Sequence, residues 1–403
     1  MKKAILFALV LALAVAFAVP AFAFKIEGAK DTKFYFGGIA MTDFGYWGRD
    51  KSLANLNGLS TNSDTAQFIL NVPRDSRIRG TVQSGNVGMF WELGLGSDLI
   101  AAHDQGDTNN ATDKFSRESY VEMRKLYGFM TFGNCTLMIG KNDGSFFALG
   151  SASMLGIENN NHRVNLGWGA LYDNRLSQIR FRQDVSKTFG WQVAFVQPFV
   201  ADVNVTEGGT TTNFDAISKF PRVDARFDLN FGAISLMPGA TFQQLMYDSN
   251  PPGYDSYANI WAVILPVKVR AGAFGFAGAV AYGQNLWKFT FQSAFHAPSY
   301  SATGKVQNAT GLLAFADFSF NAGAVTPHFI VGYDKAENTD RYKVGDSSNT
   351  RMAYSVLVNW KVADNFIVSP EFAYYNYGKT PGVPNAKDIG NEWLAGINFM
   401  FVF

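Results

Sequence analysis

The stretch PRVDARFDLNF, residues 221–231, separates apolar from charged side chains with a period of two. The apolar set is Val223, Ala225, Phe227, Leu229 and Phe231, and the set between them is Arg222, Asp224, Arg226, Asp228 and Asn230. A period of two indicates a strand, because successive side chains of a strand point to opposite faces of the sheet. Four of the five residues in the second set are charged, and such a row can only face water. The stretch therefore predicts a strand with one apolar and one wet face.

A second stretch, SRIRGTVQSGNVGMFWELGLG at 76–96, repeats this scheme as a hairpin. Its turn is Ser84-Gly85-Asn86, where Gly and Asn tolerate the positive φ of a tight turn. The predicted outward set is Ile78, Gly80, Val82, Met89, Trp91, Leu93 and Leu95, and the inward set is Arg77, Arg79, Thr81, Gln83, Gly88, Phe90, Glu92 and Gly94. Apolar side chains would face lipid and polar ones a lumen.

The composition favours a membrane barrel. Charged residues are 17% of the chain, below the roughly 25% of soluble proteins, and aromatic residues reach 15%. After the first 23 residues, no apolar run approaches the ~20 residues of a membrane helix; one of the longest, at 260–267, has eight. A closed β-barrel is the other structure that satisfies every backbone group in lipid. The single Cys135 rules out a fold held by intramolecular disulfides.

The connections between the predicted strands are short at one end and long at the other. Long polar segments lie near 48–64, 98–114, 142–170, 200–219, 247–256, 286–308, 335–350 and 378–390. The predicted strands begin near 33, 65, 87, 115, 135, 171, 190, 220, 233, 257, 275, 309, 325, 349, 366 and 389. We therefore predict an all-β chain: one transmembrane antiparallel β-barrel of about 16 strands, with short periplasmic turns and long extracellular loops.

The N-terminus has the form of a cleaved signal peptide. Lys2 and Lys3 precede an apolar run from Ala4 to Val19, and Ala21-Phe22-Ala23 forms a small-x-small cleavage site. A retained anchor helix is the alternative, but a 16-residue run is short for a membrane span. Cleavage of residues 1–23 would leave 24–403 as a single barrel domain with 32 basic and 33 acidic residues.

The last strand, NEWLAGINFMFVF at 391–403, places Trp393, Ile397, Phe399 and Phe401 on one face and Asn398 on the other. We expect it to close the barrel against the first strand, near TKFYFGGIAMTDFGYW at 32–47. In this pattern the chain resembles the Gram-negative outer-membrane porins, whose last strand typically ends in a terminal Phe. The resemblance implies an outer-membrane location in contact with lipid, and a role for Phe403 as a signal read by the barrel-assembly machinery.

The resemblance also implies a homotrimer in which the third long loop folds into the pore and faces a ladder of wall arginines. Here that loop is 142–170, with Asp143 and Glu158 as its acids. The inward arginines nearby are Arg77, Arg79, Arg124, Arg180 and Arg182. Opposed charges across a narrow wet gap would orient polar solutes. The alternative is that these arginines only pair with Glu92, Glu122 and Asp184. The Pro-Glu-Phe-Gly-Gly type of loop motif of enteric porins is absent.

The sequence contains no recognisable motif for metal binding or for enzyme catalysis. The four histidines, His103, His162, His296 and His328, lack a metal-ligand spacing, and no G-x-S-x-G motif occurs. We expect His328 to be an ordinary wall residue in the lumen. The sequence therefore predicts no enzyme, no cofactor, no metal site and no nucleic-acid partner.

Three readings of the function remain. The first is passive diffusion of small hydrophilic solutes and ions, with a weak anion preference or near neutrality from the more numerous arginines. The second is a channel selective for sugar, phosphate or carboxylate on the same scaffold. The third is a barrel that serves as an enzyme, an adhesin or an anchor.

Overall fold

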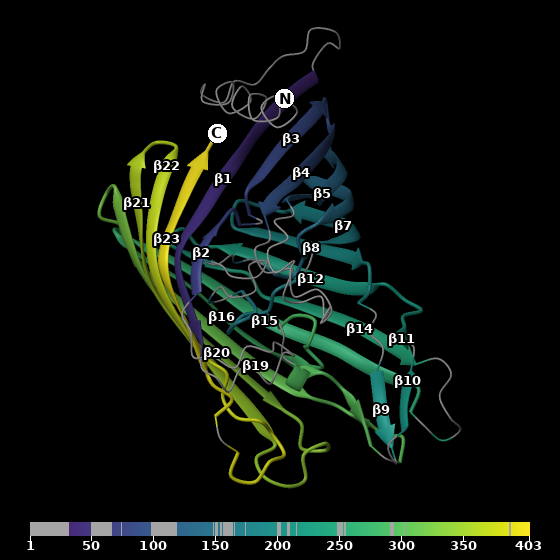
Figure 1. Ribbon diagram of the computed structural model, residues 1–403. Helices are drawn as coiled ribbons and strands as arrows, with labels where there is room; N and C mark the ends of the chain where they lie inside the picture. The colour runs from purple at the N-terminus through teal and green to yellow at the C-terminus, as the bar shows by residue number, and fades with distance from the viewer. Residues whose placement is uncertain are drawn as a thin grey trace, which may run out of the picture.

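A computed structural model shows one closed barrel of antiparallel strands (Figure 1). It describes residues 32–403 except 50–66, 74, 98–118, 148, 150–151, 154, 156–163, 165, 174, 200–202, 208–209, 215, 248–252, 254, 291–293, 302 and 387. The predicted signal peptide, residues 1–23, therefore lies outside the described residues. Among the helices of the described part, none is long and apolar enough to cross a membrane.

Nineteen strand segments form the barrel sheet, and three barrel strands consist of two segments each, which gives sixteen strands. In order round the barrel they are β1 (Thr32–Arg49), β2 (Gln67–Asn71) with β3 (Arg77–Ser84), β4 (Val87–Ser97), β5 (Ser119–Phe132), β6 (Cys135–Asn142), β7 (Leu176–Asp184), β8 (Phe189–Val196), β11 (Ala216–Ile217) with β12 (Arg222–Asn230), β13 (Ile234–Leu236) with β14 (Gly239–Tyr247), β15 (Tyr257–Ala271), β16 (Phe274–Gln284), β19 (Thr310–Phe320), β20 (Val325–Glu337), β21 (Ser348–Ala363), β22 (Phe366–Asn376) and β23 (Asn391–Val402). The prediction of an all-β barrel of about 16 strands is confirmed.

A proline lies in each of the three interruptions: Pro73, Pro221 and Pro238. Proline has no N–H to give to the ladder, so it breaks strand pairing where it falls. At the first break a side chain replaces the lost backbone partner, because Ser76 Oγ accepts a hydrogen bond from the Met41 N–H at 2.9 Å.

The first and last strands close the barrel (Figure 1). Their pairing runs from Ile39 opposite Val402 to Arg49 opposite Glu392. Phe403 extends it by one residue: its carbonyl accepts from the Gly38 N–H at 2.8 Å, and its own N–H donates to the Gly38 carbonyl at 3.1 Å. The expected pairing of the last strand with the first is confirmed.

The strands lie where the alternation places them. Most predicted starts fall within a few residues of the observed ones, and the largest difference is at β7, which was expected near 171 and begins at Leu176. The preceding residues Ala170 and Leu171 are apolar but fully buried inside the barrel, where they pack within a loop instead of pairing in the sheet. Phe401 is exposed on the outer face and Asn398 is buried on the inner face, as expected.

Two of the predicted long loops contain strands of their own. Within 200–219, β9 (Val203–Glu207) pairs with β10 (Thr210–Phe214), and within 286–308, β17 (Ser299–Tyr300) pairs with β18 (Val306–Gln307). A 3-10 helix, Ala294–His296, precedes the second pair. The β-branched residues of VNVTE and TTTNF favour strands, and the polar composition of the segment hid this signal.

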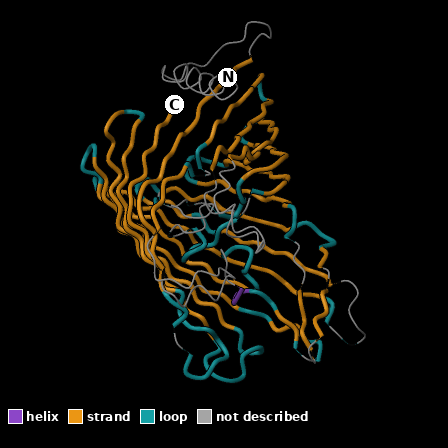
Figure 2. The backbone as a smooth tube through the Cα atoms, viewed as in Figure 1, coloured by secondary structure: helices purple, strands orange, loops and turns teal. Residues whose placement is uncertain are grey.

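Loop segments occupy the interior of the barrel (Figure 2). Two buried apolar clusters lie there, and both combine inward-facing wall residues with residues of the connection between β6 and β7. The interior of the described barrel is therefore not a uniform pore, because this connection packs against the inside of the wall.

Candidate functional site: the pore and its internal loop

The connection between β6 and β7, residues 143–175, is called loop 3 here. Its two ends are held together where it leaves the wall: the Asp143 carboxylate pairs with Arg175 Nε at 3.2 Å and with the Lys125 ammonium. These ion pairs close the neck of the loop. The described segments between these two ends pack inside the barrel.

The first attachment of loop 3 is to β12. Ser145 Oγ donates to the Asp224 carboxylate at 2.7 Å, and Asp173 near the other end of the loop pairs with Arg222. Arg222 also pairs with Asp224 at 2.9 Å, and Thr241 Oγ1 donates to Asp224 at 2.6 Å. The side chains of Arg222, Asp173 and Asp224 are all fully buried. We call Ser145, Asp173, Arg222, Asp224 and Thr241 the Arg222 cluster.

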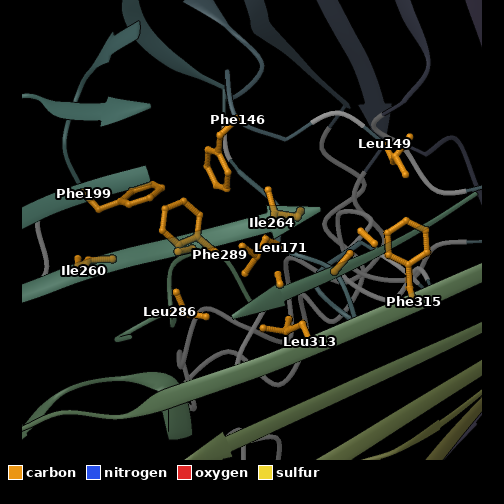
Figure 3. Close-up of a cluster of buried hydrophobic side chains, with 14 of the residues drawn as sticks. Phe146, Leu149, Leu171, Phe199, Ile260, Ile264, Leu286, Phe289, Leu313 and Phe315 are labelled. Atoms are coloured by element: carbon orange, nitrogen blue, oxygen red, sulfur yellow. The ribbon is translucent and has the colours of Figure 1, made fainter. Parts of the chain in front are cut away.

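Three aromatic rings lie against the Arg222 guanidinium: Phe146, Phe199 and Phe289. Figure 3 shows these three rings beside one another. The guanidinium carbon of Arg222 lies 5.0 Å from the ring centroid of Phe199 and 5.3 Å from that of Phe289. Phe146 meets Phe289 edge-on, with centroids 5.3 Å apart. The rings exclude water from the ion pairs and add a cation–π attraction to them.

Apolar packing carries the loop further along the wall. Leu149 and Leu171 of loop 3 belong to the same buried cluster as Ile264 on β15 and Leu313 and Phe315 on β19 (Figure 3). Beyond them, Trp168 stacks over the Arg351 guanidinium at 4.6 Å and packs on Tyr375 with ring centroids 5.0 Å apart.

A close backbone approach fixes the return path of the loop. The carbonyl of Trp168 lies where a Cβ of Gly332 on β20 would be, and Gly169 has a φ of +81°. Gly169 needs glycine because of its positive φ, and Gly332 needs glycine because a side chain there would meet the loop backbone. Both glycines are therefore required by the contact between loop and wall.

A further attachment, by hydrogen bonds, is to β22. Ser153 Oγ donates to Glu371 Oε1 at 2.5 Å, and the Leu155 N–H donates to Glu371 Oε2 at 2.9 Å. Ser355 on β21 supplies a third donor at 2.8 Å. Loop 3 is thus hydrogen-bonded to the inner wall at β12 and β22, and its Val164 lies in a buried cluster with Trp47 on β1 and Leu394 on β23. Among these attachments, the inner face of β3 to β7 carries only the neck of the loop.

That remaining face carries the five arginines singled out in the sequence, and three of them are paired with acids. Arg124 binds Glu92 at 3.1 Å and Asp75 at 2.9 Å, and Arg77 lies 3.5 Å from Glu92. Arg182 binds Asp184 at 2.6 Å and Asp228 at 2.5 Å. These three guanidinium groups are therefore largely neutralised.

The other two have no carboxylate within ion-pair distance among the described residues. Arg79 is exposed to the lumen. Arg180 donates to Gln178 Oε1 at 2.8 Å and to the Asp143 carbonyl at 2.5 Å, and both acceptors are uncharged. Arginine keeps its charge at any working pH, so these two side chains contribute most of the net positive charge of this face.

Of the two predicted loop acids, Asp143 lies at the loop neck in the ion pairs described above, and Glu158 lies outside the described residues. Four further acids of the site were not predicted from the sequence: Asp75, Asp173, Asp224 and Glu371. Asp224 stood in the alternating stretch that predicted β12. Asp173 and Glu371 gave no signal, because their partners lie far away in the chain.

The histidines support no metal site in the described residues, where no group of three or more potential ligands occurs. His328 Nδ1 lies 2.9 Å from Asp317 on the inner wall, and His296 Nε2 lies 2.6 Å from Asp334. The His328–Asp317 pair joins the neighbouring strands β20 and β19. The His296–Asp334 pair joins a loop to β20.

No protein-family model matches the chain. No curated protein matches it in sequence. Solved structures do match. The outer membrane channel DcaP of Acinetobacter baumannii superposes with a TM-score of 0.66 at 11% identity, over 94% of this chain and 99% of that one. The outer-membrane expressed OmpT of Vibrio cholerae gives 0.55 at 11% identity, over 94% and 100%.

The anion-selective porin from Comamonas acidovorans gives 0.53 at 10% identity, over 92% of this chain and 100% of that one. Each likeness extends over nearly the whole of both chains, although the sequences have diverged. With its closed ring of sixteen antiparallel strands, polar inner face and apolar outer face, the chain has the fold of the outer-membrane porins.

Proposed function

We propose that the protein is an outer-membrane channel for the passive diffusion of small hydrophilic solutes and ions. The observation that carries this proposal is the attachment of loop 3 at both Arg222 and Glu371. A loop held at both sides narrows the lumen at a fixed position and leaves the arginine-bearing face of β3 to β7 along the open path. Permeation would then be decided by size and charge at that position.

The charge of that face favours anions. Arg79 and Arg180 have no carboxylate partner in the described part of the chain, whereas Arg77, Arg124 and Arg182 have two each. We infer a weak preference for anions, with Arg79 and Arg180 as the residues that produce it. Asp143 and Glu158 remain the proposed loop acids of the constriction.

A substrate-selective channel is the second candidate. The observation that favours it is that Arg180 has no carboxylate partner in the described residues and so offers donors to a solute bearing a carboxylate or phosphate. Such a channel would show a current that one class of solute blocks saturably, whereas a general diffusion channel would not.

We further propose that residues 1–23 are removed on export to the outer membrane of a Gram-negative cell and that Phe403 is read by the barrel-assembly machinery. We propose a homotrimer as the working form. One similar structure, of OmpT from Vibrio cholerae, is described as a trimer form. Cross-linking in mild detergent tests this, and a protein that remains monomeric there contradicts it.

Single-channel recording in planar bilayers tests the channel itself. We expect discrete current steps whose conductance rises with salt concentration, since the path is water-filled. A purified, folded protein that inserts without producing steps contradicts the proposal.

A further inference from the structure

The inner face beside the arginines carries three aromatic side chains in a row, Phe90 on β4 and Tyr127 and Phe129 on β5. The rings of Phe90 and Tyr127 stack with centroids 5.2 Å apart and an interplanar angle of 22°. Phe129 continues the row at 6.4 Å from Tyr127. All three are half-buried, so part of each ring is open to the lumen.

This aromatic row adjoins Arg180. In the sheet register Tyr127 lies opposite Gly140, and Gly140 lies opposite Gln178, the residue that accepts two hydrogen bonds from Arg180. Gly140 places no side chain between them. The Tyr127 hydroxyl is accordingly within electrostatic reach of the Arg180 guanidinium.

Arg180 is only partly engaged. Its Nε and Nη2 donate to Gln178 and to the Asp143 carbonyl, while Nη1 donates to no acceptor in the described residues. A guanidinium held in place by two neutral acceptors keeps its full charge and offers its remaining donors to a solute. Its planar geometry suits the two oxygens of a carboxylate or sulfonate.

We propose that Phe90, Tyr127, Phe129 and Arg180 form a binding subsite for aromatic anions on the wall of the channel. The ring of the solute stacks on the aromatic row, and its acidic group binds Arg180. Stacking against an aromatic face should favour an aromatic over a saturated ring about two- to tenfold. The inference rests on the proposed channel function, because it concerns solutes that enter the lumen.

Current block by benzoate tests the subsite in single-channel recordings. Wild-type protein should show saturable block by benzoate, and weaker block by cyclohexanecarboxylate, which has the same charge without an aromatic ring. Neutral benzyl alcohol should block least. Equal block by benzoate and cyclohexanecarboxylate overturns the proposal.

Two variants separate the two halves of the subsite. Arg180→Gln should raise the half-blocking benzoate concentration about tenfold, the effect of losing one hydrogen bond to a charged group. Phe90→Leu with Tyr127→Leu should remove the advantage of benzoate over cyclohexanecarboxylate and keep the apolar surface. The control is Tyr282→Leu, because Tyr282 is an exposed aromatic residue on β16, away from β4 and β5.

If benzoate block is unchanged in Arg180→Gln and in the double variant, the subsite does not exist. Wild-type open-channel conductance in potassium chloride is measured in the same recordings. If the wild type conducts but benzoate does not block it selectively, only the subsite is contradicted. If the wild type does not conduct, the channel function is contradicted instead. Heat-modified migration on gels confirms that each variant is folded before it is recorded.

Discussion

Ser153 and Glu371 lie 218 residues apart in the chain, yet a 2.5 Å hydrogen bond joins the middle of loop 3 to the wall at β22. The same carboxylate also accepts from the Leu155 N–H and from Ser355 Oγ. A single acidic side chain thus holds Ser153 and Leu155 of the loop against the wall at β21 and β22. This makes Glu371 the first residue to change when the position of the loop is tested.

The variant Glu371→Gln should loosen the attachment of loop 3 to β22. It replaces a charged acceptor by an amide whose NH₂ faces donors, and the loss of hydrogen bonds to a charged group costs about 1.5–3 kcal/mol. We expect a lower free energy of unfolding and noisier open-channel currents. The control is Glu337→Gln, because Glu337 makes only an exposed ion pair with Lys335 in the described structure. Equal current noise in the two variants contradicts the role of Glu371.

Removal of the buried charge at Arg222 should be among the most destabilising changes. Arg222→Met leaves Asp173 and Asp224 buried without their cation, and breaking a buried pair in this way costs about 3–5 kcal/mol. Urea unfolding of the lipid-reconstituted protein measures this. The triple variant Arg222→Met, Asp173→Leu, Asp224→Leu should recover most of the loss, and if it is no more stable than the single variant, the ion pairs are not the cause.

Barrel closure should depend on a glycine of β1. A Cβ at Gly38 would lie 2.6 Å from the ring of Phe403 and 2.7 Å from the Arg77 carbonyl. Gly38→Val should therefore lower the temperature at which the folded barrel becomes heat-modified on gels. Ala40→Val is the matched control, because Ala40 lies two residues along the same outer face and is exposed. An equal effect of both substitutions contradicts the steric account.

The stability of the loop that contains β17 and β18 should fall at acid pH, because Asp255 becomes protonated there. The Lys305 ammonium and the Val306 N–H, each at 2.9 Å, hold the pKa of the Asp255 carboxyl below its ordinary value of 3.8. Because the folded-state pKa is lowered, the stabilisation is complete above the ordinary pKa and is lost as pH falls through the lower folded value. Exchange of the Val306 amide hydrogen, measured relative to an unstructured peptide at the same pH, should accelerate over that interval. In Asp255→Asn the acceleration should disappear, and its persistence there contradicts the assignment to Asp255.

The strands could be predicted from the sequence because alternation is a local property. Residues such as Val223 and Arg222 reveal the two faces of β12 without reference to any partner. The path of loop 3 could not be predicted in this way. Ser153 and Glu371, or Asp173 and Arg222, become neighbours only when the sheet closes on itself, and no pattern near either residue indicates it.

The pairing of the arginines could be predicted only in part, because alternation assigns some of the partners to a face and not others. Arg182 and Asp184 share a strand face, so alternation places them together. Asp75, which binds Arg124, lies at the break after Pro73, where the period of two is interrupted and a side chain cannot be assigned to a face. Only the three-dimensional arrangement therefore shows that Arg79 and Arg180 have no acid partner among the described residues.

We propose a water-filled channel whose narrow part is charged by Arg79 and Arg180. The reversal potential in a potassium chloride gradient, measured on wild type and on the triple variant Arg77→Ser, Arg79→Ser, Arg180→Ser, tests it most directly. We predict a wild-type potential displaced toward the chloride equilibrium potential at low salt, and a smaller displacement near 1 M, where the Debye length falls to ~3 Å. The reversal potential of the triple variant should move toward the potassium equilibrium potential. The triple variant should also pass bulky solutes more readily. A triple variant with the same reversal potential and conductance as wild type contradicts the claim.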